Sequence, residues 1–136
     1  MADAVNHPPH YTEGFKTKQI ECFDIAKHMD FARGNAFKYV WRAGKKGGLE
    51  KAMEDLDKAK WYLWRSTRQV NNEAVAAFGL LIPQDSGVEG VRYRALRAIV
   101  NGYRDYCEPF CNELRDRLRM KENENDERGF DTDDER

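Results

Sequence analysis

The sequence of 136 residues has few cysteines, few prolines and no long apolar run. Its three cysteines are an odd number and form no CxxC pair, which argues against a disulfide framework and a structural zinc site. No uncharged apolar stretch approaches the length needed to cross a membrane, and the first residues lack the order of a secretion signal. We therefore expect a cytoplasmic protein whose cysteines stay reduced and fill the core.

The sequence also lacks a large excess of charge of one sign. Its formal net charge is −1, although basic residues prevail in residues 1–70 and acidic residues prevail in residues 121–136. The acidic segment has almost no apolar side chains, so burial cannot offset the entropy that ordering costs. We predict a single helical domain over residues 1–120 and a disordered acidic tail over residues 121–136.

Strand patterns are missing too, because no stretch alternates apolar and polar residues between turn signals. Apolar residues instead recur at helical spacing in four stretches, within residues 19–29, 36–43, 49–68 and 96–118. Gly44 stands where a left-handed residue would end the second helix. Pro109 should kink or break the last helix near Tyr106 to Glu108. The sequence predicts an all-α fold, a compact bundle of four or five helices with an extended N-terminal arm.

A phosphate-binding loop of the Walker type is also absent. The segment GNAFKYVWRAGKKGG, residues 34–48, contains glycine and lysine in a similar order. However, Tyr39 stands where the first glycine belongs, and Lys46 stands where serine or threonine belongs. If this segment holds phosphate, it does so from a helix face and not from a classical loop.

Polar residues of this segment share one face of the second predicted helix. They are Asn35, Lys38, Arg42 and Lys45, with Lys46 beside them. Arginine in a forked geometry and lysines as point charges could neutralise the oxygens of a di- or triphosphate. The alternative is a solvated face whose charges pair with carboxylates of the neighbouring helices.

The N-terminal segment NHPPHY, residues 6–11, places two histidines around a pair of prolines. In a polyproline turn, His7 and His10 project from the same side about 9 Å apart, so one metal ion would hardly reach both. They could clamp a ligand or carry a proton, or they could pack the arm against the bundle together with Tyr11.

Carboxylates form a third group of candidates. Glu21 and Asp24 share the first predicted helix, and Glu54 and Asp55 share the third. If these helices face each other, the four carboxylates could hold Mg²⁺ against a nucleotide phosphate. The alternative is ordinary ion pairing, including Glu54 with Lys58 four residues later.

In order, NHPPHY, IECFDI, GNAFKYVWRAGKKGG and LEKAMEDLDKAKWYL resemble a small phage-encoded domain that is catalogued as a domain of unknown function. They are similar to the phage nucleotide kinase that phosphorylates deoxynucleoside monophosphates without a Walker motif. The resemblance covers residues 7–63. It points to His10, Tyr11, Glu21, Gly34, Asn35, Lys38, Tyr39, Arg42, Gly44, Lys45, Lys46, Asp55, Leu56, Lys58, Ala59 and Tyr62. Most of these positions lie on the polar faces that periodicity isolates.

The resemblance implies a nucleotide kinase that uses a nucleoside triphosphate as donor, with a Mg²⁺ requirement left open. The expected catalytic residues are His10, Arg42 and Asp55. The expected nucleotide-binding residues are Tyr11, Asn35, Lys38, Tyr39, Arg42, Lys45, Lys46 and Lys58. The candidate metal ligands are Glu21, Asp24 and Glu54, and a base could stack on Tyr11 or Trp41.

Two other functions remain open on the sequence: a nucleotide-binding or sequestering protein without turnover, and an all-α nucleotide pyrophosphohydrolase. The near-neutral total charge and the acidic tail count against nucleic-acid binding. Trp41, Trp61 and Trp64 exceed the aromatic surface that a small bundle buries easily, so we expect a homo-oligomer.

Overall fold

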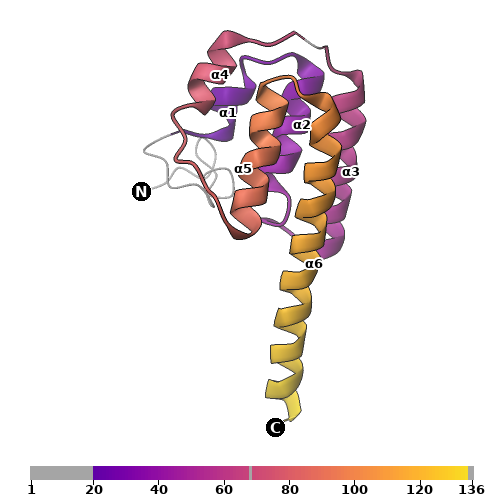
Figure 1. Ribbon diagram of the computed structural model, residues 1–136. Helices are drawn as coiled ribbons and strands as arrows, with labels where there is room; N and C mark the ends of the chain where they lie inside the picture. Colours follow the sequence, from indigo (N-terminus) through magenta and orange to yellow (C-terminus); the bar gives the residue numbers. More distant parts are fainter. Residues whose placement is uncertain (1–19, 68, 135–136) are drawn as a thin grey trace.

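The computed structural model describes residues 20–67 and 69–134, with side chains up to residue 125. In this part of the chain the secondary structure consists of six helices and no strand (Figure 1). The helices are α1 (Cys22–Ala26), α2 (Phe31–Arg42), α3 (Leu49–Arg65), α4 (Asn72–Phe78), α5 (Gly87–Val100) and α6 (Arg104–Asp134). The prediction of an all-α bundle is confirmed. None of the helices described is both long and apolar enough to cross a bilayer.

The four long helices surround a single core. α2 and α6 each pack on both α3 and α5, so the four helices close a ring. The short helices α1 and α4 contact each other; α1 also packs on α2, and α4 also packs on α5. The inward positions of the long helices include Phe37, Val40, Trp41, Ala52, Leu56, Ala59, Leu63, Leu96, Ile99, Leu114 and Leu118. Trp41 is fully buried, so the prediction that it is an exposed aromatic and could stack on a base is wrong.

α2 begins earlier than its apolar pattern indicates. Asp30 precedes the helix, and its side chain accepts a hydrogen bond from the backbone N–H of Arg33 over 2.9 Å. This N-cap satisfies one of the donors that the first helical turn leaves without a partner. Residues 31–33, which the apolar pattern assigns to a linker, therefore form the first turn of α2.

The break between the last two helices lies at residues 101–103 and not near Pro109. Gly102 has a φ of +75°, and the N–H of Tyr103 donates to the carbonyl of Ala98 over 2.9 Å, which closes the end of α5. Pro109 lies inside α6 at an exposed position, where solvent can reach the carbonyl that its missing N–H leaves free. The predicted break at Tyr106 to Glu108 is therefore wrong.

α6 continues past the bundle. Its first half packs on α3 and α5, whereas the acidic segment from residue 121 projects away from the bundle (Figure 1). The backbone of that segment is helical up to Asp134. A helix without tertiary contacts is marginally stable in water. Its described side chains, those of residues 121–125, are not buried.

All three cysteines lie in the core as free thiols. Burial raises the pKa of Cys22, Cys107 and Cys111 to about 12 in each case. Because a thiol must ionise before it reacts as a nucleophile, these side chains are inert at neutral pH. They fill space in the core, as the sequence predicts.

Gly44 ends α2 in the left-handed conformation that the sequence predicts, with a φ of +84°. A Cβ at this position would lie 2.7 Å from Cδ2 of Leu118, so Gly44→Ala meets both backbone strain and a steric clash. We expect it to lower the free energy of unfolding by about 1–3 kcal/mol in urea denaturation. Gly48→Ala is the control, because a Cβ there meets nothing within 4 Å. Equal losses in the two variants would contradict this account.

Candidate functional site

The outward faces of α2 and α3 meet around the ring of Tyr39. Three cationic groups lie near the ring centroid: Nζ of Lys38 at 4.6 Å, the guanidinium carbon of Arg42 at 4.9 Å and Nζ of Lys58 at 5.6 Å. Each gains from the negative face of the aromatic ring, which offsets part of the repulsion among the three charges. The arrangement concentrates positive charge on a surface that the solvent reaches.

Arg42 is held by a buried carboxylate. Its Nη2 lies 3.2 Å from Oδ1 of Asp55, whose side chain is only 1% exposed. Nζ of Lys51 lies 3.7 Å from the same oxygen. Asp55 is buried because it stands on the side of α3 that faces α2, between Ala52 and Ala59. This ion pair fixes the guanidinium beside Tyr39.

Lys58 is held from the solvent side of α3. Its Nζ lies 2.7 Å from Oε1 of Glu54, and the hydrogen bond between them lowers the pKa of Glu54 and raises the pKa of Lys58. An exposed pair of this kind contributes little to stability. A phosphate oxygen can therefore compete with Glu54 for the ammonium group of Lys58.

A groove of about 710 Å³ runs along α3 beside Tyr39. Its lining residues are Tyr39, Glu50, Met53, Glu54, Asp57, Lys58, Trp61 and Tyr62. The ring of Tyr62 stacks on that of Tyr39 with 5.9 Å between centroids, and the ring of Trp61 stands edge-on to Tyr62 at 5.1 Å. The groove thus joins flat aromatic surfaces to the cations around Tyr39, which suits a ligand with a planar and an anionic part.

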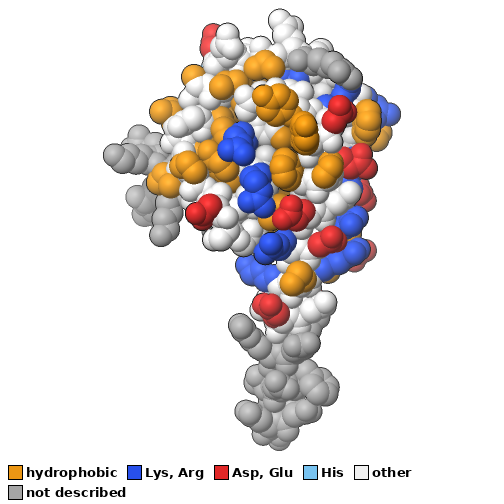
Figure 2. Space-filling model, viewed as in Figure 1, with side chains coloured by type: hydrophobic (Ala, Val, Ile, Leu, Met, Phe, Trp, Pro, Cys, Tyr) orange, Lys and Arg blue, Asp and Glu red, His pale blue; other side chains and the backbone are white. Residues whose placement is uncertain are grey.

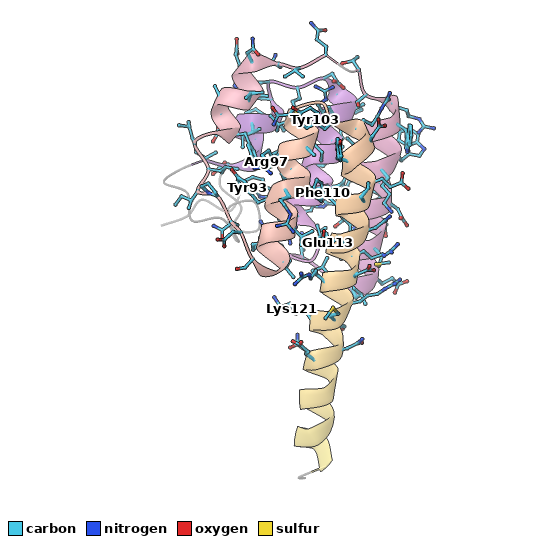
Figure 3. All side chains as sticks on the ribbon, in the orientation of Figure 1. Tyr93, Arg97, Tyr103, Phe110, Glu113 and Lys121 are labelled. Carbon is cyan, nitrogen blue, oxygen red and sulfur yellow. The ribbon has the colours of Figure 1, made fainter. Side chains whose placement is uncertain are left out.

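A larger cavity of about 910 Å³ lies beyond the C-terminal end of α2, between the α2–α3 loop, the start of α5 and α6. Of the predicted site residues it includes only Lys45. Its other charged groups have mixed sign, and among them is Lys121, which projects from α6 near the lower end of the bundle (Figure 3). We assign the candidate site to the α2–α3 face, where five predicted residues converge.

The residues that converge there are Lys38, Tyr39, Arg42, Asp55 and Lys58. The other predicted binding residues that the structure describes make different contacts. Nζ of Lys45 sits 5.0 Å from the ring of Trp41, and Lys46 is exposed in the loop after α2. Asn35 uses its Nδ2 to donate to the carbonyl of Phe31 over 2.8 Å. His10 and Tyr11 lie outside the described residues.

The predicted metal ligands do not meet. Asp24 caps the start of α1, where it accepts a hydrogen bond from the N–H of Glu21 over 2.9 Å. Glu54 belongs to the lysine pairs of α3. Within the residues that the structure describes, no three Asp, Glu, His or Cys side chains lie close enough to hold a metal ion. These side chains therefore offer no preformed Mg²⁺ site.

Two buried arginines, Arg33 and Arg92, hold the ends of α2 through hydrogen bonds to backbone carbonyls. Neither of them was identified from the sequence. Arg33 donates to the carbonyls of Thr67 and Gln69 and so ties the chain after α3 to the start of α2. Arg92 donates to the carbonyl of Val40 over 2.6 Å. It also donates to the carbonyl of Trp41 over 3.0 Å. Arginine is rarely buried, so residue type alone places both at the surface.

Residues 5–64 match the model of a family described as a protein of unknown function, DUF3310. The match includes α1, α2 and all but the last residue of α3. The matched segment therefore includes every residue of the candidate site. No curated protein matches the chain, and neither does any solved structure.

Proposed function

We propose that the α2–α3 face binds nucleotide phosphates and that the protein is a nucleotide kinase, which transfers a phosphoryl group to a deoxynucleoside monophosphate. The supporting observation is the set of three cations around Tyr39, one of which is fixed by the buried carboxylate of Asp55. Phosphoryl transfer needs chiefly positioning of the two substrates and positive charge around the transferred group. A helix face with this arrangement supplies both without a Walker loop.

In the proposed reaction, the bond between the γ-phosphorus and the bridging oxygen of the triphosphate donor breaks. A phosphate oxygen of the monophosphate forms the new bond to the γ-phosphorus, and two diphosphates result. Because the second pKa of a phosphate monoester is about 6, the acceptor is largely ionised at neutral pH and needs no strong base. Lys38, Arg42 and Lys58 stabilise the charge on the transferred oxygens.

Asp55 then positions Arg42 and does not receive a proton. Its Oδ1 already faces the guanidinium, and its side chain is 1% exposed. The groove beside Tyr39 supplies the place for the base, since Tyr62 and Trp61 offer aromatic surfaces there in place of the buried Trp41. Proteins usually hold Mg²⁺ through one or two carboxylates together with substrate phosphates, so the donor would bring any ion into this site.

The test combines each deoxynucleoside monophosphate with a triphosphate donor, with and without Mg²⁺, and resolves the products by ion-exchange chromatography. We expect diphosphates from a monophosphate acceptor. Lys58→Gln and Lys38→Gln should each lower kcat/KM by about tenfold or more, because each removes a charge that stabilises the transferred group. Lys27→Gln is the matched control, because Lys27 is exposed beside the ring of Phe23 and is not among the cations around Tyr39.

Other products would identify the other functions. Nucleotide binding in calorimetry without any product would indicate a sequestering protein. Monophosphate and pyrophosphate formed from the donor alone would indicate a pyrophosphohydrolase. If no nucleotide binds, or if the Lys58 and Lys38 variants match the Lys27 variant, the assignment of the site is wrong.

A further inference from the structure

A connected cluster of aromatic rings from α2 and α3 lies along the groove face of α3, and two of the rings are largely exposed. The centroid of the Tyr62 ring lies 6.1 Å from that of Phe31, 5.9 Å from that of Tyr39 and 5.1 Å from that of Trp61. Phe31 is 79% exposed and Trp61 is 52% exposed. Contiguous exposed aromatic surface of this kind marks interaction sites, where tryptophan and tyrosine are enriched.

The charges along this face change sign from one end of α3 to the other. Glu50, Glu54 and Asp57 occupy the first part of the groove. Arg65 lies in the last turn, with its guanidinium carbon 3.6 Å from the centroid of the Trp61 ring. Glu50 and Asp57 form no ion pair with any residue that the structure describes. The face therefore has an acidic end with unpaired carboxylates and a basic end fixed against an aromatic ring.

A face whose charge reverses along one helix complements itself when two copies lie antiparallel. A twofold axis produces this arrangement, because each residue pair across it then occurs twice. We propose that the groove face of α3 binds the same face of a second copy of this chain, with the axis near Asp57 and Lys58. Glu50 then lies opposite Arg65 of the partner subunit, and Asp57 lies opposite Lys58 of the partner subunit.

This dimer closes the groove beside Tyr39. In one chain the groove is open to solvent, whereas in the dimer Glu54 faces Trp61 of the partner subunit across it. Trp61 and the rings beside it are then buried on either side of the axis, and Glu50 and Arg65 lie at the rim. The inference goes beyond the proposed kinase function and does not depend on it, because the dimer requires no nucleotide.

The outward face of α5 and α6 also carries apolar side chains, but its charges do not have this pattern. Figure 2 shows apolar side chains gathered over these helices, and Figure 3 shows Tyr93, Arg97, Phe110 and Glu113 on them. Glu113 already pairs with Arg94 over 3.4 Å within the chain. Arg97 lies 5.9 Å from the ring of Tyr93. This face serves as the control surface in the test.

Sedimentation equilibrium of the full chain over a range of concentrations tests the proposal. We expect a dimer in the unmodified protein. Trp61→Glu should raise its Kd by about 100-fold or more, because it buries an unpaired charge in the interface, opposite Glu54 of the partner subunit. Tyr106→Glu is the matched control, since Tyr106 is 63% exposed on α6. A monomer at all concentrations, or dissociation by Tyr106→Glu and not by Trp61→Glu, would overturn the proposal.

Charge reversal tests the antiparallel arrangement. Arg65→Glu and Glu50→Arg should each raise the dimer Kd about tenfold, because each places like charges opposite one another. The double variant restores opposite charges and should return the Kd to within about threefold of the original value. Circular dichroism checks that each variant keeps its helices. Failure of the double variant to recover, with its helices intact, would exclude the proposed pairing of Glu50 with Arg65.

Discussion

Arg42→Met should lower the free energy of unfolding by about 3 kcal/mol, because it leaves the buried carboxylate of Asp55 without its main partner. Breaking a buried ion pair usually costs about 3–5 kcal/mol. We expect the lower value here, because Nζ of Lys51 remains 3.7 Å from Oδ1 of Asp55. The double variant Arg42→Met with Asp55→Leu removes both charges and should recover most of this loss. Urea denaturation followed by circular dichroism measures both changes.

The double variant also separates stability from activity. Under the proposed function it should fold normally yet lack kinase activity, because its site has lost the positioned guanidinium. Arg115→Met is the control: its ion pair with Asp116 spans 3.2 Å at the surface, and its removal should cost less than about 0.5 kcal/mol. A single Arg42 variant as stable as the unmodified protein would show that the buried pair contributes nothing.

Arg92→Met should destabilise the protein by about 3–5 kcal/mol, because it removes the partners of two buried carbonyls. The last turn of α2 has four carbonyls that its own helix cannot all satisfy. The carbonyls of Tyr39 and Arg42 accept hydrogen bonds from the N–H groups of Ala43 and Lys45, over 3.0 Å and 2.9 Å. The carbonyls of Val40 and Trp41 rely on Arg92.

The matched control for this prediction is Arg94→Met. Arg94 lies two residues away on α5 and is half-buried, with an ion pair to Glu113 over 3.4 Å. Its removal should cost less than about 1 kcal/mol in thermal or urea denaturation. Similar losses in the two variants would mean that closure of α2 by Arg92 contributes no more than a surface contact.

The helical periodicity of the sequence was sufficient to predict the class of fold and the polar face of α2. Lys38 and Arg42 stand on that face as expected, because their spacing is a property of one helix. The spacing of Trp41 from Phe37 also indicated its burial. The expectation of an exposed tryptophan rested on the number of aromatic residues and ignored this register. Asp30 was likewise a readable N-cap signal.

The approach of α3 to α2 could not be predicted from the sequence. It buries Asp55 against Arg42 and brings Lys58 to the ring of Tyr39. Contacts of this kind depend on the packing of two helices, which no pattern within either helix specifies. The same holds for Arg92, whose acceptors lie about fifty residues earlier in the chain. Charged residues usually lie at the surface, but the packing of the helices buries Asp55 and Arg92.

Because four helices share one core, the folding unit extends further along the chain than the family match does. The family match ends at residue 64, yet the inner sides of α2 and α3 rest on α5 and α6. A polypeptide that stopped at residue 64 would expose Leu63, which lies beside Ile99 of α5 and Cys107 of α6, to water. The matched segment is thus half of a core. To hold α2 and α3 in place, the matched segment needs a second layer of helices, either from the same chain or from another chain.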